Sequence, residues 1–358
     1  MVKEMIHMTK QVCIRNLKIG GGAPVSIQSM TNTDTRDIES TVAQIQALEA
    51  AGADIVRFSV YDEKCAAAIP HIKERCSVPL VADIHFDYKL AILSAENGID
   101  KLRINPGNIG SFENVKKVSA CAKAHKIPIR VGVNSGSVEK ELLAKYKSPT
   151  ADALCESALG HVKLLEAAGF TDIVISVKAS NVKTTVEAYR KLSGLCSYPL
   201  HIGVTESGLD EMGLVKSAVG LGSLLMDGIG DTMRVSLTGD PVREIHAAKY
   251  ILRALDMEKS GWVDIVSCPT CGRTTGNSEE VIHALRDYIS DIKPKRHVKI
   301  AVMGCVVNGP GEAREADIGI AFAPHGAVVF RNGVVAYSGE REDMLRRFFA
   351  DCREECMK

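Results

Sequence analysis

Three cysteines in the last third of the chain have the spacing of metal ligands. Cys268 and Cys271 lie in the segment SCPTCGR, and Cys305 lies in MGCVVNGPGEA. Thiolates in this number suit an iron-sulfur cluster, a zinc ion or redox exchange. Three cysteine ligands rather than four would leave one metal position open for chemistry. The segment therefore predicts a metal or redox function.

Three kinds of cysteine site fit this spacing. A thioredoxin-type pair is disfavoured because that motif opens a helix after a strand and needs no third cysteine. Structural zinc is possible if a histidine such as His297 closes a tetrahedral site. An iron-sulfur cluster is modestly favoured, because the glycines after Cys305 let the backbone approach a bulky cluster. Cys352 and Cys356 are interpreted as exposed or half-buried residues of the last helix.

Short β-branched segments alternate with helical segments over the first two thirds of the chain. Eight such units in roughly 250 residues predict a closed barrel of parallel strands rather than an open doubly wound sheet. The glycines at 20–22 precede the first strand instead of following it, which disfavours dinucleotide binding. We predict an α/β fold, a (β/α)8 TIM-like barrel over residues 1–258, and then a small α+β iron-sulfur domain over residues 263–358.

The active site of such a barrel is built at the carboxyl ends of its strands. Five cationic side chains fall at these ends, in a chain whose Lys+Arg and Asp+Glu counts are both 44. Together they would form a local positive site for a ligand with two phosphates. The alternative is a set of rim salt bridges, or a network in which Asp83 and Glu206 neutralise part of the charge. The predicted mouth residues are Arg57, Asp83, His85, Arg103, Arg130, Asn134, Lys178, Glu206, Arg234 and Ser236.

The composition and the missing motifs argue against several classes of function. Balanced charge gives no indication of nucleic-acid or membrane binding, and the N-terminus lacks the apolar stretch of a secretory signal. We therefore expect a cytoplasmic enzyme with neither kind of partner. The sequence has no Walker A loop, HExxH or GxSxG motif. A zinc-stabilised barrel enzyme acting on a phosphorylated sugar remains the alternative function.

The cysteine segments and the strand ends together resemble one enzyme family. SCPTCGR and MGCVVNGPGEA, with SIQSMTNTDT, ADIHF, LRINPGN, RVGVNSGS, SVKAS, VTESG and RVSLTGD, are similar to bacterial-type 4-hydroxy-3-methylbut-2-en-1-yl diphosphate synthases. The resemblance spans nearly the whole chain. It implies reductive ring opening and dehydroxylation of 2-C-methyl-D-erythritol 2,4-cyclodiphosphate to (E)-4-hydroxy-3-methylbut-2-enyl diphosphate, in the non-mevalonate route to isoprenoids.

The resemblance also implies a cofactor and partners. Cys268, Cys271 and Cys305 would hold one [4Fe-4S] cluster per chain, and Glu312 would complete its coordination in the resting enzyme. Flavodoxin or ferredoxin would deliver the electrons. We expect a head-to-tail homodimer, because the last barrel helix takes the chain to the end of the barrel opposite the mouth. The cluster domain of a partner could then cover the mouth more readily.

Within the mouth we assign separate roles to the acidic and amide side chains. Glu206 is the candidate proton donor or orienting group for the departing hydroxyl. Asp83 and Asn134 would position the carbon chain of the substrate, and His85 is a candidate substrate contact. The five cations would hold the diphosphate, whose charge redistributes as the ring opens.

Overall fold

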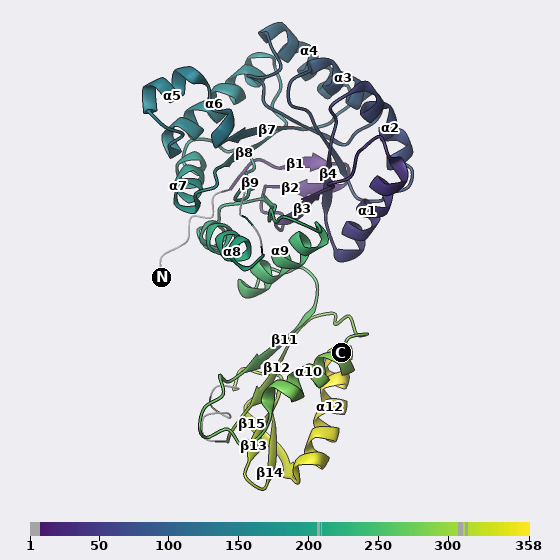
Figure 1. The fold of residues 1–358 in the computed structure, drawn as a ribbon, viewed down its shortest axis with the longest axis vertical. Helices are drawn as coiled ribbons and strands as arrows, with labels where there is room; N and C mark the ends of the chain where they lie inside the picture. The colour runs from purple at the N-terminus through teal and green to yellow at the C-terminus, as the bar shows by residue number, and fades with distance from the viewer. Residues whose placement is uncertain (1–7, 206–207, 209, 307–310, 312–313) are drawn as a thin grey trace. The chain divides into compact units, whose positions relative to one another are not determined.

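The computed structural model describes residues 8–205, 208, 210–306, 311 and 314–358 of the chain. The chain divides into two units, with the boundary between Met257 and Glu258, and each unit is described by itself (Figure 1).

Eight parallel strands in the described part of the first unit form a barrel. They pair in the order β8-β7-β6-β5-β4-β3-β10-β9, and a parallel bridge between Ile175 and Leu200 joins the two ends of this order. The predicted (β/α)8 barrel is therefore confirmed. The strands are β3 (Ser26–Met30), β4 (Ile55–Ser59), β5 (Leu80–Asp83), β6 (Lys101–Ile104), β7 (Ile129–Asn134), β8 (Ile173–Lys178), β9 (His201–Ile202) and β10 (Thr232–Met233).

Helices surround the barrel and bury apolar side chains against the outer faces of its strands (Figure 1). Asp37, Asp62 and Asn181 begin three of them, each accepting a hydrogen bond from a backbone N–H of the first turn. The helices are α1 (Ile38–Ala51), α2 (Glu63–Lys73), α3 (Tyr88–Glu96), α4 (Phe112–Ala124), α5 (Lys140–Tyr146), α6 (Ala151–Ala167), α7 (Val182–Ser193), α8 (Asp210–Met226) and α9 (Val242–Ala254), with a short 3-10 turn at Ser135–Ser137.

A hairpin that the sequence did not predict closes the bottom of the barrel. Its strands β1 (Val12–Ile14) and β2 (Leu17–Ile19) pair antiparallel. Ile14 and Ile19 pack with Ile55 and Val81 in a fully buried cluster. Since Ile55 and Val81 lie at the amino ends of β4 and β5, the hairpin forms an apolar floor opposite the mouth.

The second unit is a small α+β fold. Its sheet has the order β11-β12-β13-β14-β15, in which the first three strands are parallel and the remaining pairs antiparallel. The helices α10 and α12 pack on one face of the sheet. The elements are β11 (Trp262–Ser267), α10 (Ser278–Tyr288), β12 (His297–Met303), β13 (Ile318–Ala323), β14 (Gly326–Arg331), β15 (Val334–Gly339) and α12 (Arg341–Met357).

The interpretation of Cys352 and Cys356 as exposed or half-buried was wrong. Both side chains lie in α12 and are fully buried in the core between this helix and the sheet. Burial raises the pKa of each thiol. They act as small apolar core residues.

None of the helices in the described part of the chain combines the length and apolar character needed to cross a lipid bilayer.

Candidate active site

A cavity of about 140 Å³ lies among the carboxyl ends of the barrel strands. The structure brings nine of the predicted mouth residues together around it. Thr205, which follows β9 and was not predicted, also contributes to the wall. Glu206 lies outside the described residues. The lining residues are Arg57, Asp83, His85, Arg103, Arg130, Asn134, Lys178, Thr205, Arg234 and Ser236.

Asp83 is the anionic centre of this cavity. Its carboxylate is buried and accepts a hydrogen bond of 3.0 Å from Arg103 Nη1. Arg57 Nε lies 3.7 Å away and His85 Nε2 lies 3.6 Å away from the same group. Burial alone would raise the pKa of Asp83, but Arg57, His85 and Arg103 hold it well below its usual range. Asp83 is therefore ionised and orients two guanidinium groups.

A second carboxylate enters the site from α9. Glu244 is buried and lies 3.0 Å from Arg234 Nη2. Ser29 Oγ donates a hydrogen bond of 2.8 Å to Glu244, which fixes the carboxylate between β3 and β10. Glu206 was predicted for such pairing, and Glu244 was not. The available signal was an acidic residue in the first turn of the helix that follows Arg234.

The remaining cations lack carboxylate partners in the described part of the chain. Arg130 is 1% exposed and donates one hydrogen bond of 2.8 Å to Ser176 Oγ, while its Nε and Nη2 have no partner among these residues. Burial and the neighbouring guanidinium groups lower the pKa of Arg130 and of Lys178. Burial lowers the pKa of Arg57 to about 10. The cavity is thus rich in buried donors that an anion would satisfy.

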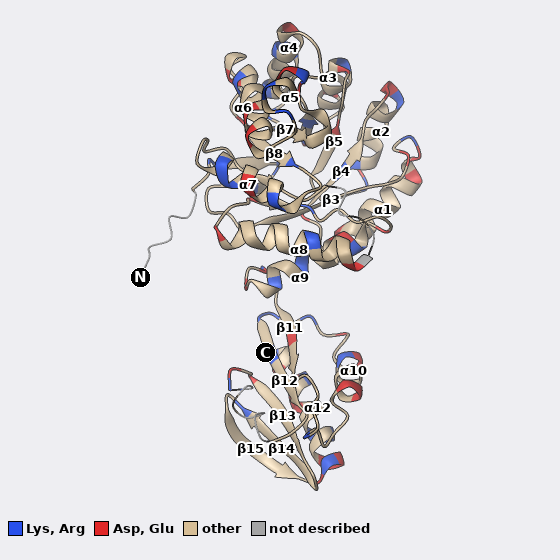
Figure 2. Ribbon diagram, turned by 60° about the vertical axis from the view of Figure 1, so that its left-hand side comes forward, with Lys and Arg blue, Asp and Glu red and all other residues tan. Residues whose placement is uncertain are grey.

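Charge elsewhere on the molecule is mixed. Figure 2 shows both signs of charge on the helices of each unit. The concentration of cations at the barrel mouth is a local feature, which a balanced total charge does not reveal.

Two glycines, Gly132 within β7 and Gly203 directly after β9, leave room for these cations. A Cβ atom at Gly132 would lie 2.5 Å from Arg103 Nε. At Gly203 it would collide with Lys178 Nζ and lie 2.9 Å from the carbonyl oxygen of Arg234. Neither residue was predicted, although for Gly132 a glycine inside a strand is a known sign of close approach.

The cysteine segments lie at one edge of the sheet in the second unit. Cys268 follows β11 and Cys305 follows β12, and these strands are parallel neighbours with Ser267 paired to Val302. The backbone N–H of Gly304 donates a hydrogen bond of 3.1 Å to Cys268 Sγ. Hydrogen bonds from the backbone and side chain of Arg273 lower the pKa of the exposed Cys271 thiol.

This donor set fits a thiolate-bound cluster. Thiolates are soft ligands, and backbone N–H groups directed at sulfur are typical of iron-sulfur sites. Gly304 is packed so closely that a Cβ there would lie 2.9 Å from Thr274 Cγ2, which couples the Cys305 loop to the Cys271 loop. The fit rests on the type of donor and on the Gly304 N–H, because among the described residues no group of three or more His, Cys, Asp or Glu side chains is gathered as a ligand set. Glu312 lies outside these residues.

His297 does not belong to the cysteine segments. It begins β12 and stacks on Trp262 with ring centroids 4.2 Å apart. The opposite end of that strand is about 20 Å away at the rise of an extended chain, and Cys305 lies beyond it. The alternative prediction, a zinc site with His297 as its fourth ligand, is therefore wrong.

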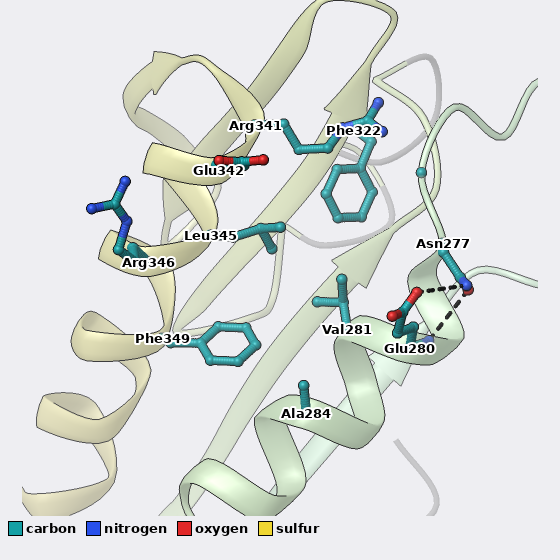
Figure 3. A pocket seen from close by; sticks show the side chains of 11 residues that line it. Asn277, Glu280, Val281, Ala284, Phe322, Arg341, Glu342, Leu345, Arg346 and Phe349 are labelled. Atoms are coloured by element: carbon teal, nitrogen blue, oxygen red, sulfur yellow. Dashed lines mark hydrogen bonds between the residues drawn. The ribbon is translucent and has the colours of Figure 1, made fainter.

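A second cavity, of about 580 Å³, lies between α10 and α12 in the second unit. Figure 3 shows Val281, Ala284, Leu345 and Phe349 directed into it, with charged side chains at its rim. Arg341 at this rim donates a hydrogen bond of 2.7 Å to the carbonyl oxygen of Thr275. The apolar interior makes it unsuited to a phosphorylated substrate.

Both units match models of one protein family. Residues 9–249 match the GcpE TIM-barrel domain, and residues 264–354 match the GcpE protein C-terminal domain. The chain belongs to the GcpE family. This confirms the family predicted from the strand ends and cysteine segments.

Curated members of the GcpE family match almost the full chain. A relative from Fusobacterium nucleatum is 56% identical, and the match covers 95% of this chain and 96% of the relative's chain. A relative from Caldanaerobacter subterraneus is 54% identical and covers 97% of each chain. Both carry the name 4-hydroxy-3-methylbut-2-en-1-yl diphosphate synthase (flavodoxin).

Among solved structures, the GcpE-family barrel of this chain is similar to 3-dehydroquinate dehydratase from Geobacillus kaustophilus. The TM-score is 0.51 at 13% identity, over 70% of this chain and 99% of that one. At this identity the likeness shows the barrel fold alone.

Proposed function

We propose that this chain catalyses the reductive ring opening and dehydroxylation of 2-C-methyl-D-erythritol 2,4-cyclodiphosphate to (E)-4-hydroxy-3-methylbut-2-enyl diphosphate. The reaction belongs to the non-mevalonate route to isoprenoid precursors, and reduced flavodoxin supplies its electrons. The observation that carries the proposal is the cavity, in which residues on or just after seven strands combine five cations with Asp83 as the one carboxylate among the described lining residues. The names of the relatives fit a substrate with two phosphates.

The cations bind and orient the diphosphate. Arg103 and Arg57 are held by Asp83, and Arg234 is held by Glu244, so these three groups are ordered before a ligand enters. Groups that are already fixed lose little entropy on binding. They also stabilise the charge that accumulates on the phosphates as the ring opens.

Arg130 and Lys178 have a different role in the proposed site. Since neither has a carboxylate partner in the described part of the chain, the substrate phosphates provide their counter-charge. Asp83 and Asn134 position the carbon chain, and His85 contacts the substrate from the exposed side of the cavity. Glu206 donates or orients the proton for the departing hydroxyl.

The second unit holds the redox centre in this proposal. Cys268, Cys271 and Cys305, with Glu312 in the resting enzyme, would hold a [4Fe-4S] cluster. Such a cluster supplies electrons one at a time. The Gly304 N–H, which already contacts Cys268 Sγ, would stabilise negative charge on sulfur.

The complete site is shared between two copies of the chain, in a head-to-tail homodimer. Lys249 of α9 lies over Gly52, the residue that ends α1. The end of α9 is therefore at the bottom of the barrel, where the linker to β11 begins. A partner's cluster domain then reaches the mouth more readily than the domain of the same chain.

Anaerobic purification followed by metal analysis and turnover tests the function. We expect iron and sulfide in a ratio that indicates one [4Fe-4S] cluster per chain, and reduction of the cyclodiphosphate by reduced flavodoxin. Cys305→Ala should remove the cluster and the activity together. The matched control Cys352→Ala, in the core of α12, should retain both. Protein that holds zinc without iron or sulfide, or that leaves the cyclodiphosphate unchanged, would falsify the proposal.

A further inference from the structure

The inside of the barrel below the cavity is polar. In most TIM barrels this space is filled by Val, Ile and Leu. Here Ser26, Gln28, Lys101 and His201 occupy it, and each is at least 99% buried. The Ser26 hydroxyl, both Gln28 amide atoms, Lys101 Nζ and His201 Nε2 have no hydrogen-bond partner among the described residues.

Lys101 lies between the apolar floor and the cavity. It precedes Arg103 by two residues on β6, so both side chains point into the barrel, with Lys101 closer to the bottom. Its neighbour on β5 is Val81, which packs on the hairpin residues Ile14 and Ile19. Lys101 is absent from the cavity wall and lies one layer beneath it.

In the described part of the barrel, the principal charges around Lys101 are of its own sign. Arg130 on β7 and Arg57 on β4 are its principal charged neighbours, and His201 faces it from β9. Asp83 on β5 is engaged by Arg57 and Arg103 rather than by Lys101. Burial lowers the pKa of Lys101, and Arg130 and Arg57 lower it further. The free protein therefore disfavours a charged ammonium at this position.

A diphosphate in the cavity would favour the charged form of Lys101 instead. Two negative charges arriving above Arg130 offset the repulsion that Lys101 experiences, and the low-dielectric interior strengthens the effect. In a cyclic diphosphate each phosphate has one strongly acidic oxygen, so the ligand itself does not titrate near neutral pH. Any proton exchanged on binding must then belong to the protein.

We propose that Lys101 is uncharged in the free protein and takes up a proton from solvent when a diphosphate binds in the cavity above it. Lys101 thereby adds a positive charge below the cavity only when the anion is present. Lys101 is a positioning residue, which acts on the ligand through Arg130 and the field of the barrel. The choice of ligand rests on the proposed function.

Calorimetric titration tests this inference. The anaerobic holoenzyme, without reductant, is titrated with the cyclodiphosphate near neutral pH in buffers of different ionisation enthalpy. We expect proton uptake by the wild type, and about one proton fewer per site for Lys101→Met. Lys123→Met, a change of an exposed lysine on α4, is the matched control and should match the wild type.

Equal proton uptake by the wild type and Lys101→Met overturns the inference, as does a wild type that takes up no proton. If Lys101→Met does not fold, Lys101→Gln replaces it, and thermal unfolding checks both variants. A wild type that fails to bind the cyclodiphosphate contradicts the proposed function instead. In that case dimethyl diphosphate with one methyl group on each phosphate repeats the test of Lys101, because it too is singly ionised at each phosphorus.

Discussion

At the scale of single residues, Asp83 organises the candidate site. A buried carboxylate is costly unless cations and hydrogen bonds compensate it, and Arg57 and Arg103 provide both. In return the carboxylate fixes where these guanidinium groups point. Removing its charge while keeping its shape would leave two buried cations without their partner.

Asp83→Asn should therefore lower the free energy of unfolding by about 3 kcal/mol near neutral pH. The pKa of Asp83 is depressed in the folded state, so its contribution is present above the unfolded pKa, which is about 3.9. It is lost as the pH falls through the folded value. The difference between wild type and variant should thus stay constant down to about pH 4 and shrink below it.

Urea unfolding at a series of pH values measures this difference. Asp152→Asn, in an exposed ion pair with Lys191, is the control and should change stability by no more than about 1 kcal/mol. An Asp83→Asn variant as stable as the wild type would mean that Asp83 does not hold the two arginines.

The residues that the sequence predicted and those that it missed differ in how they reach the site. Arg57, Arg103 and Arg130 lie on parallel strands, so the alternation of side chains and the barrel topology are enough to direct them into the barrel. Arg130 is the second residue of β7 rather than a residue of its carboxyl end, and its side chain still lines the cavity. Glu244 arrives from a helix, and only the packing of α9 against β3 and β10 brings it to Arg234. The sequence pattern of one segment cannot predict a contact that depends on how a helix packs against distant strands.

At the scale of elements, β7 shows how a strand accommodates a charged neighbour. Gly132 lies between Arg130 and Asn134 on the inner face, and its missing side chain is the space that the Arg103 guanidinium occupies. The strands were easy to predict from their apolar runs. The hairpin of β1 and β2 was not, because two three-residue strands are too short to show a period.

Gly132→Ala should move Arg103 and weaken cyclodiphosphate binding by about tenfold or more, as expected for one charge-assisted hydrogen bond. The fold should survive, because the collision involves the flexible end of a side chain. Gly160→Ala on α6, where a new Cβ meets nothing within 4 Å, is the control and should bind normally. Calorimetric titration of both variants decides the matter, and unchanged affinity for Gly132→Ala would argue against Arg103 as a ligand contact.

At the scale of the whole molecule, the chain divides its proposed chemistry between two units. The candidate substrate cavity belongs to the barrel, and the cysteine segments belong to the small α+β unit. A site shared between subunits predicts that defects in different units can complement each other.

Mixing a Cys305→Ala protomer with an Arg130→Met protomer tests this sharing. Each variant alone should be inactive, while a heterodimer has one site with both defects and one intact site. If subunits exchange at random, activity should recover to about a quarter of the wild-type value. Each variant taken through the same exchange with itself is the control. No recovery, after mass analysis has shown that heterodimers form, would mean that each chain serves its own barrel.

The hairpin floor determines how molecules can enter and leave the barrel. Ile14 and Ile19 block the end opposite the mouth with fully buried apolar side chains. The cavity is therefore a dead end at its base, and substrate must enter, and product must leave, through the same opening. The next substrate cannot enter until the product has left through the mouth. Product release is therefore a step that every catalytic cycle has to complete.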